Sequence, residues 1–214
     1  MTHLILIRHG QSQANLERRF AGIYDAPLTA LGERQAALSA AYVAKNYKIS
    51  RVYASDLRRA YFTGKAAADA CGVEIVPDRR LREISAGAWE GMLFDEIVEK
   101  YPEDFGLFMT DVGASRATDG ESVAELAARV MDALHDLAEH HDGETVVIAT
   151  HATPIRAAQS LVSYGDLAHM QSLKWVSNAS VTDLVYDKGA FHFDLISHDE
   201  HLAGLVTKLP DTIE

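Results

Sequence analysis

Runs of aliphatic residues alternate along the chain with segments whose apolar positions recur at helical spacing. Residues 4–7 are entirely aliphatic and residues 145–149 nearly so, without the polar alternation of a half-exposed strand. Between them, Ser122 and Glu125 form a capping-box pattern, which an apolar stripe at helical spacing follows. This order of strands and helices predicts an α/β fold, a three-layer sandwich with a mostly parallel central sheet flanked by helices.

The same patterns place the other elements. Two short strands and a late β-hairpin are predicted at residues 51–54, 73–76, 181–186 and 191–196. The remaining helices are predicted at about residues 30–46, 57–71 and 154–164. Thr29 is expected to cap the first of these helices, and Gly72 to end the second.

The stretch from about residue 92 to residue 120 departs from this alternation. It has helical pieces, but its apolar spacing is irregular and it contains Pro102, Gly106 and Gly113. We interpret this stretch as a small inserted cap. No repeat, low-complexity tract or long linker divides the sequence, so residues 1–214 are expected to form a single domain.

Composition narrows the class of protein. No apolar run approaches the roughly 20 residues that span a bilayer, and no signal-peptide pattern opens the sequence. Cys71 is the only cysteine, which excludes an intramolecular disulfide and fits a reducing cytoplasm. The net charge of −11 argues against a nucleic acid or an anionic membrane as partner. We therefore expect a cytoplasmic protein with a small-molecule partner, whose oligomeric state the sequence does not indicate.

Polar side chains follow the two most aliphatic strands at the point where each strand ends. Arg8 and His9 follow the first strand, and His151 follows the strand at residues 145–149. Ligands of open α/β sheets bind beyond the carboxyl ends of the strands. A guanidinium group beside an imidazole at such an edge suits a phosphate group.

Two further polar sets lie between these strands. Residues 55–60 (Ser-Asp-Leu-Arg-Arg-Ala) follow a strand and open a helix, whose N-terminus offers N–H groups to an anion. Glu83, within residues 81–84, supplies the carboxylate that phosphate chemistry at a histidine needs as a proton donor.

With these four sets, the chain resembles the histidine phosphatase superfamily, also called the phosphoglycerate mutase-like family. The resemblance runs from Leu4 to about Tyr186. It rests on ordered motifs at residues 8–12 with Asn15, 22–35, 55–60, 81–84 leading to Gly87 and 89–91, 120–122, and 143–151. The residue before Ala60 matches the family's arginine, which is Arg59 here.

The resemblance implies a role for each matching residue. His9 would attack phosphorus and form a phosphohistidine, which requires a neutral imidazole. Arg8, Arg59 and His151 would hold the phosphoryl oxygens. Glu83 would protonate the leaving oxygen and then take a proton from the attacking water. No metal ion or cofactor is implied, because the arginines and His151 supply the positive charge.

Further positions match the family's substrate-binding residues, namely Gln11, Asn15, Gly22 and Ala152. Ala152 is a departure, because the family usually has glycine after the second histidine. A backbone N–H donated to phosphate survives this change if the position does not require positive φ. Gln13 and Ala14 also depart, since many members have an acidic residue and an aromatic residue there.

Within the superfamily, the sequence favours a metal-independent phosphomonoesterase for small organic phosphates over a cofactor-dependent phosphoglycerate mutase. The mutases have a longer and more basic insert between the acid and the second histidine, whereas His151 follows Glu83 by only 68 positions (151 − 83 = 68). A non-catalytic phosphate-binding module is a third reading. The physiological substrate stays open.

The remaining features allow either two interpretations or a purely structural one. The apolar residues at 92–94 and 105–109 either pack the cap onto the core or wall the pocket. His140 and His141 are expected to lie at a solvated helix end. His198 and His201 lack the spacing of known metal-ligand sets, so no metal site is predicted.

Overall fold

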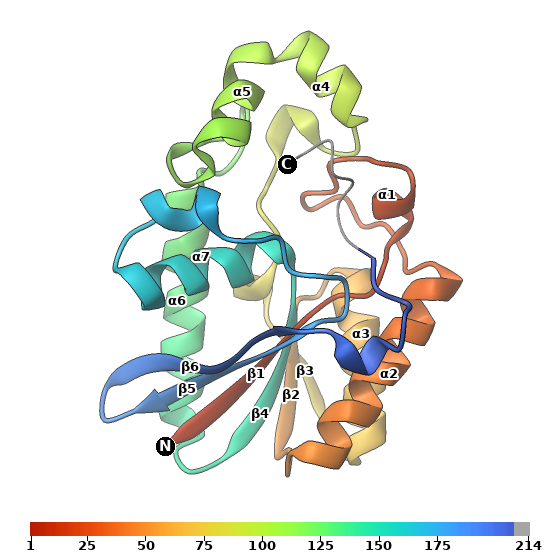
Figure 1. Ribbon diagram of the computed structural model, residues 1–214, viewed down its shortest axis with the longest axis vertical. Helices are drawn as coiled ribbons and strands as arrows, with labels where there is room; N and C mark the ends of the chain where they lie inside the picture. The colour runs from red at the N-terminus through yellow and green to blue at the C-terminus, as the bar shows by residue number, and fades with distance from the viewer. Residues whose placement is uncertain (208–214) are drawn as a thin grey trace.

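The computed structural model describes residues 1–207, and its centre is one six-stranded sheet (Figure 1). The strands are β1 (Thr2–Arg8), β2 (Arg51–Ala54), β3 (Ile75–Pro77), β4 (Thr145–Thr150), β5 (Val181–Asp187) and β6 (Ala190–His198). Their order across the sheet is β3-β2-β4-β1-β5-β6. The first four are parallel, and β5 runs antiparallel to β1 and forms a hairpin with β6. The predicted mostly parallel sheet is confirmed.

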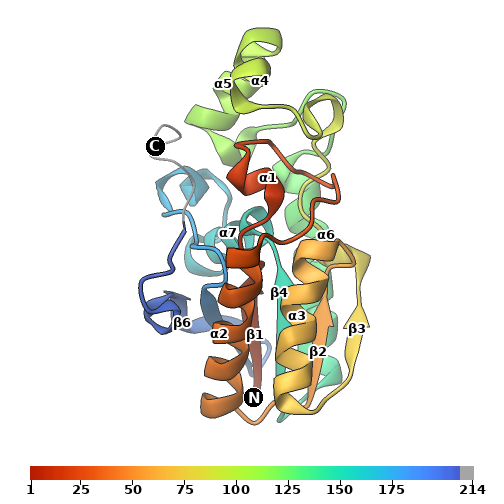
Figure 2. The same ribbon diagram turned by 90° about the vertical axis from the view of Figure 1, so that its right-hand side faces the viewer.

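Helices cover both faces of the sheet. On one face lie α2 (Ala30–Asn46) and α3 (Arg58–Cys71), which Figure 2 places in front of the strands. On the other face lie α6 (Val123–His140) and α7 (Ala152–Tyr164). Alternate residues of β1 pack against the two helix layers, because successive side chains of a strand point to opposite faces. Ile5 and Ile7 pack toward α2 and α3, and Leu4 and Leu6 pack toward α6. The three-layer sandwich is thus confirmed.

Local sequence signals set most helix ends. The Thr29 hydroxyl accepts a hydrogen bond from Gly32 N at 3.0 Å, and Gly72 ends α3 in the left-handed region at φ 68°. At the start of α6, Ser122 and Glu125 make both hydrogen bonds of a capping box. The predicted ends of these three helices are therefore confirmed.

Two predicted element starts are displaced by two residues. The strand predicted from Val73 begins at Ile75, because Val73 N donates to Ala68 O and completes the end of α3. The helix predicted from Pro154 begins at Ala152. Proline is tolerated in the first helical turn, where an N–H has no partner inside the helix.

The cap lies beyond the carboxyl ends of the parallel strands (Figure 1). It contains α4 (Phe94–Lys100) and α5 (Pro102–Thr110), and a single turn α1 (Gln13–Leu16) lies nearby. Aromatic rings join cap to core: the Phe20 ring lies 5.3 Å from Phe108 and 5.5 Å from the buried Trp89, centroid to centroid. No helix within residues 1–207 is long and apolar enough to cross a membrane.

The prediction of a solvated helix end is wrong for His141, although His140 is exposed. His141 is buried, with Nε2 2.9 Å from the Tyr53 hydroxyl and Nδ1 2.7 Å from the Glu144 carboxylate. The turn after α6 folds this imidazole back onto β2, where two polar partners compensate its burial.

Candidate active site

A pocket opens where the carboxyl ends of the parallel strands meet the cap. Most of the residues proposed for the site from sequence line it: Arg8, His9, Asn15, Gly22, Arg59, Glu83 and Ala152. They come from segments as far apart in sequence as β1 and α7. The parallel pairing of strands explains this convergence, because it brings several strand ends to one edge of the sheet.

The two histidines lie side by side because their strands are neighbours in register. Arg8 pairs with Thr150 across β1 and β4, so His9 and His151 leave the sheet at the same level. Their ring centroids are 5.1 Å apart, and His9 N donates to Thr150 O at 2.9 Å. The prediction that these two distant histidines are neighbours at one edge of the sheet is confirmed.

One hydrogen bond orients the imidazole of His9. Its Nδ1 lies 2.7 Å from the carbonyl oxygen of Gly10, and a carbonyl can only accept. Nδ1 therefore carries the hydrogen, and Nε2 carries the lone pair of the neutral ring. This arrangement is suited to a nucleophile that attacks through Nε2.

The surroundings keep both rings neutral. Burial, followed by the charges of Arg59 and Arg8, holds the pKa of His9 well below its usual value. Burial and Arg59 act in the same direction on the pKa of His151. The Nε2 atom of His151 lies 2.8 Å from the Ser55 hydroxyl, which orients the second ring.

Two buried guanidinium groups face this pair of rings. Arg59, in the first turn of α3, is fully buried and donates to the carbonyls of Tyr24 at 2.9 Å and Gly22 at 2.7 Å. Arg8 donates to the carbonyl of Val176. Within residues 1–207 neither arginine forms an ion pair, and the Nε of each has no partner. Burial lowers the pKa of Arg8 to about 10 and also lowers that of Arg59.

Glu83 is held at the pocket by backbone groups. Its carboxylate accepts hydrogen bonds from Ile84 N at 3.0 Å and from Thr153 N at 3.4 Å. The Arg129 side chain donates to the carbonyls of residues 80, 82 and 83 at 2.8–2.9 Å and forms an ion pair with Glu121. Arg129 thus fixes the segment that carries Glu83. No local pattern in the sequence predicts this role, because the carbonyls that Arg129 binds lie 46 to 49 positions away.

Two other predicted positions differ in placement. Asn15 lines the pocket, and its Oδ1 accepts from Ser12 N at 3.0 Å and Asn178 Nδ2 at 3.2 Å. Gln11 does not line it. Its amide oxygen accepts from the Thr29 hydroxyl at 2.9 Å, so the side chain braces the start of α2.

Neighbouring arginines have structural partners. Arg58 is exposed, in agreement with the choice of Arg59 for the pocket. Arg82 forms a two-pronged ion pair with Asp56, at 2.6 Å for each hydrogen bond. Arg116 pairs with Glu125 at 2.8 Å. Neither Arg82 nor Arg116 lines the pocket.

The outer part of the pocket is mostly aromatic. Phe20, Phe94, Phe108 and Trp175 line it, so the cap both packs on the core and walls the pocket. Among residues 1–207, the one further cation in the lining is Arg19, whose Nε donates to Glu17 at 2.7 Å and whose Nη1 donates to Gly91 O at 2.8 Å.

A buried arginine packs against one of these aromatic rings. The guanidinium carbon of Arg156 lies 3.9 Å from the centre of the Trp175 ring, and Arg156 also donates to the carbonyls of Met170 and Leu173 at 2.7 and 3.1 Å. The sequence alone predicts a role for neither residue, because no local pattern relates them and they meet only when the segment after α7 folds back.

Comparison with known proteins identifies the class to which this pocket belongs. The family model of the histidine phosphatase superfamily (branch 1) matches residues 4–199. The chain belongs to this superfamily, as the motifs indicated, and it is an enzyme of the phosphatase and mutase class. Membership supports phosphatase activity.

Some individual relatives are named as phosphatases and others as mutases. The chain is 35% identical over 172 residues to "Phosphoserine phosphatase 1" of Hydrogenobacter thermophilus, covering 80% of this chain and 81% of that protein. It is 35% identical over 191 residues to "Probable phosphoglycerate mutase GpmB" of an Enterobacter species, covering 88% and 86%. Among solved structures, Bacillus stearothermophilus YhfR superposes with a TM-score of 0.90 at 31% identity, covering 94% of this chain and 100% of that one.

Proposed function

We propose that the chain is a metal-independent phosphomonoesterase that hydrolyses small organic phosphates through a phosphohistidine intermediate on His9, without a cofactor. The observation that carries the proposal is the buried pair Arg8 and Arg59, neither of which forms an ion pair within the described residues, beside an imidazole whose Nε2 bears the lone pair. Buried cations without paired carboxylates favour a bound anion. A phosphate monoester is largely a dianion near neutral pH, and its oxygens suit forked guanidinium groups.

Substrate binding uses groups that line the pocket, together with His151 beside His9. The positive charges of Arg8 and Arg59 neutralise the charge that spreads over the phosphoryl oxygens in the transition state, and the neutral imidazole of His151 donates a hydrogen bond to them. Asn15, Gly22 and the first N–H groups of α7 at Ala152 contact the bound substrate. Gln11 acts through Thr29 on the start of α2 and does not touch the substrate.

Transfer then proceeds in two balanced steps. The His9 Nε2 lone pair attacks phosphorus while the bond to the ester oxygen breaks, and protonated Glu83 gives its proton to that oxygen. In the second step water attacks phosphorus and the bond to Nε2 breaks. The Glu83 carboxylate takes the proton of this water, so inorganic phosphate leaves and both residues return to their starting states.

The pocket walls indicate which leaving groups fit. Apart from the phosphate-binding set, the lining is mostly aromatic, and its further cation, Arg19, forms an ion pair with Glu17 and also donates to Gly91 O. Beyond Arg8 and Arg59, the described lining holds no cation without a carboxylate partner that could bind a substrate carboxylate. This favours phosphate esters with uncharged, partly apolar leaving groups, and it argues against a phosphoglycerate mutase.

The first experiment compares wild type, His9→Ala and His140→Ala in hydrolysis of p-nitrophenyl phosphate with EDTA present. His140 is an exposed histidine outside the pocket and serves as the matched control. We expect turnover and an acid-labile phosphoryl group on protein quenched in denaturant, both lost only in His9→Ala. Phosphoserine and 3-phosphoglycerate complete the substrate panel.

Each outcome separates the alternatives. Interconversion of 2- and 3-phosphoglycerate faster than release of phosphate would make the chain a mutase. Phosphate binding with neither turnover nor trapped label, across the whole panel, would make it a binding module. Turnover that survives in His9→Ala would exclude the phosphohistidine route.

A further inference from the structure

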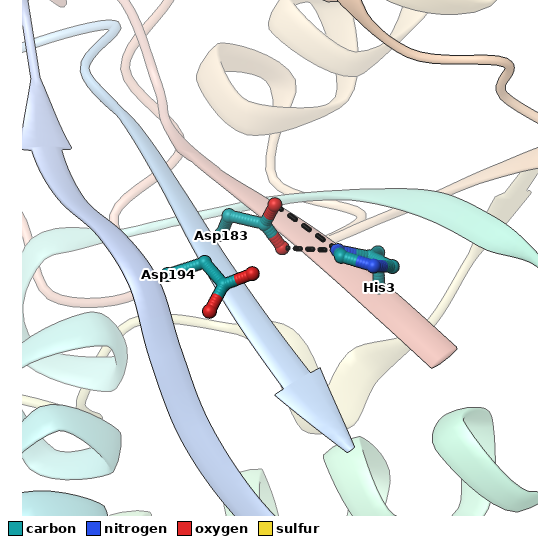
Figure 3. Close-up of side chains that lie close together, drawn as sticks. All are labelled: His3, Asp183 and Asp194. Atoms are coloured by element: carbon teal, nitrogen blue, oxygen red, sulfur yellow. Dashed lines mark hydrogen bonds and ion pairs between the residues drawn. The ribbon is translucent and has the colours of Figure 1, made fainter. Parts of the chain in front are cut away.

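A second group of ionisable side chains lies at the end of the sheet away from the pocket. His3 stands near the start of β1, whereas His9 follows its end. The His3 Nδ1 atom is 3.0 and 3.1 Å from the two carboxylate oxygens of Asp183, and the Asp194 carboxylate points toward the same space (Figure 3). One ligand atom from each of the three residues lies within 4.8 Å of the other two.

The register of three neighbouring strands creates this cluster. Asp183 of β5 pairs with Ile5, which shares a face of β1 with His3. On β6, His192 pairs with Val185 of β5, and Asp194 lies two residues further on. His192 Nε2 is 3.4 Å from Asp194 Oδ1, so a second imidazole adjoins the cluster. Ligands on paired strands are held by the backbone, not by loop conformation.

The cluster has an excess of negative charge. Asp183 is only 4% exposed, and a carboxylate oxygen of Asp194 lies within 4.8 Å of one of its own carboxylate oxygens. Within residues 1–207 no lysine or arginine forms an ion pair with either aspartate; their ionic partners are His3 and His192. A bound cation would compensate this field.

We propose that His3, Asp183 and Asp194 bind one divalent transition-metal ion of the Zn²⁺ type, with His192 as the fourth ligand. Two imidazole nitrogens and two carboxylate oxygens suit Zn²⁺ and its first-row neighbours, whereas Mg²⁺ and Ca²⁺ prefer oxygen ligands alone. Ligand atoms of a tetrahedral zinc site lie about 3.3 Å apart, given bonds of about 2.0–2.1 Å. Rotation of the Asp194 and His192 side chains, which are about half exposed, closes the remaining distance.

The ion would stabilise the fold without entering catalysis. It would link the start of β1 to the β5–β6 hairpin, whose β6 strand is an edge of the sheet. Binding to the folded chain alone raises its stability in proportion to the logarithm of ion concentration over Kd. This proposal is independent of the proposed phosphatase function, since the cluster contains no residue of the pocket.

The test uses untagged protein stripped with a chelator and then freed of it. Isothermal titration and thermal unfolding are measured with Zn²⁺, Mg²⁺ and Ca²⁺, and Co²⁺ absorption reports the ligand geometry. We expect one Zn²⁺ per chain, a rise in Tm of about 5 °C at a hundredfold excess over Kd, and the visible bands of tetrahedral Co²⁺. Mg²⁺ and Ca²⁺ should leave Tm unchanged.

Variants locate the ion. Asp194→Ala and His192→Ala should each weaken Zn²⁺ binding at least about tenfold, whereas Asp187→Ala on the same hairpin should not. Hydrolysis of p-nitrophenyl phosphate in EDTA should be equal in all three variants and wild type. No binding of Zn²⁺ would overturn the proposal and leave the cluster a hydrogen-bonded pair. Binding that persists in Asp194→Ala would overturn it as well, because the ion would then lie elsewhere.

Discussion

At the scale of single residues, the pocket depends on positive charges that the fold buries without a direct ion pair among the described residues. Arg58 and Arg59 are adjacent, yet one is exposed and the other is fully buried against the carbonyls of Gly22 and Tyr24. Carbonyl oxygens orient a guanidinium group but leave its net charge in place. That charge is available to a phosphate and, in its absence, acts on His9.

Replacing Arg59 by methionine should therefore remove catalysis selectively. We expect kcat/KM for p-nitrophenyl phosphate to fall by about 10²–10³, the usual loss when one preorganised donor to a transition-state oxyanion is removed. Arg58→Met is the matched control and should stay within about twofold of wild type, because surface substitutions have small effects. Equal losses in the two variants would contradict the assignment of Arg59 to the pocket.

The dependence of kcat/KM on pH should also reflect the charge of Arg59. Because burial, Arg59 and Arg8 lower the pKa of His9, its reactive neutral form persists as pH falls through 6.5. The acid limb of kcat/KM should therefore lie below that pH. In Arg59→Met the acid limb should move up toward 6.5. The substrate's own ionisation is common to both profiles, so an unmoved limb would contradict this coupling.

At the scale of elements, the position of the nucleophile His9 depends on how closely the turn after β1 approaches the start of α2. A Cβ added to Gly10 would strike the carbonyl of Gly32, and one added to Gly32 would strike the backbone of Gln11. The turn after β1 is thus pressed against the first turn of α2. His9 precedes this contact by one residue, so the contact fixes the position from which its ring enters the pocket.

Gly32→Ala should separate these segments and lower the free energy of unfolding by about 1–3 kcal/mol, the usual cost of overpacking. It should also lower kcat, since His9 moves with the turn. Gly106→Ala is the control: in α5 an added Cβ meets nothing within 4 Å, and alanine stabilises a helix interior by up to about 1 kcal/mol relative to glycine. Urea unfolding and kcat measured for both variants test this. A Gly32→Ala protein as stable as wild type would refute the close approach.

At the scale of the whole molecule, the sequence predicted what depends on local pattern or on strand order. Aliphatic runs located β1 and β4, and parallel topology then placed His9 beside His151. It could not predict contacts between distant segments, such as Arg129 with the carbonyls around Glu83 or Arg156 with Trp175. His141 was wrongly predicted to be solvated for the same reason, because its partner Tyr53 lies 88 positions away.

The cap and core also act together on substrate choice, and Phe94 tests this. It belongs to α4 of the cap, is half-buried, and lines the pocket beside Phe20, with ring centroids 6.0 Å apart. In Phe94→Ala, kcat/KM for p-nitrophenyl phosphate should fall about tenfold, as expected for losing an apolar contact worth about 1–2 kcal/mol. The value for phosphoserine should change much less, because its charged leaving group gains little from an aromatic wall.

Phe62→Ala removes an aromatic ring of the same size from the outer surface of α3, where it is 51% exposed. This control should leave both substrates unaffected, since its ring lies outside the pocket lining. A parallel loss for the two substrates in Phe94→Ala would mean that the residue only holds the cap in place. A loss confined to the aromatic ester would mean that the cap selects the leaving group while the sheet edge supplies the phosphate chemistry.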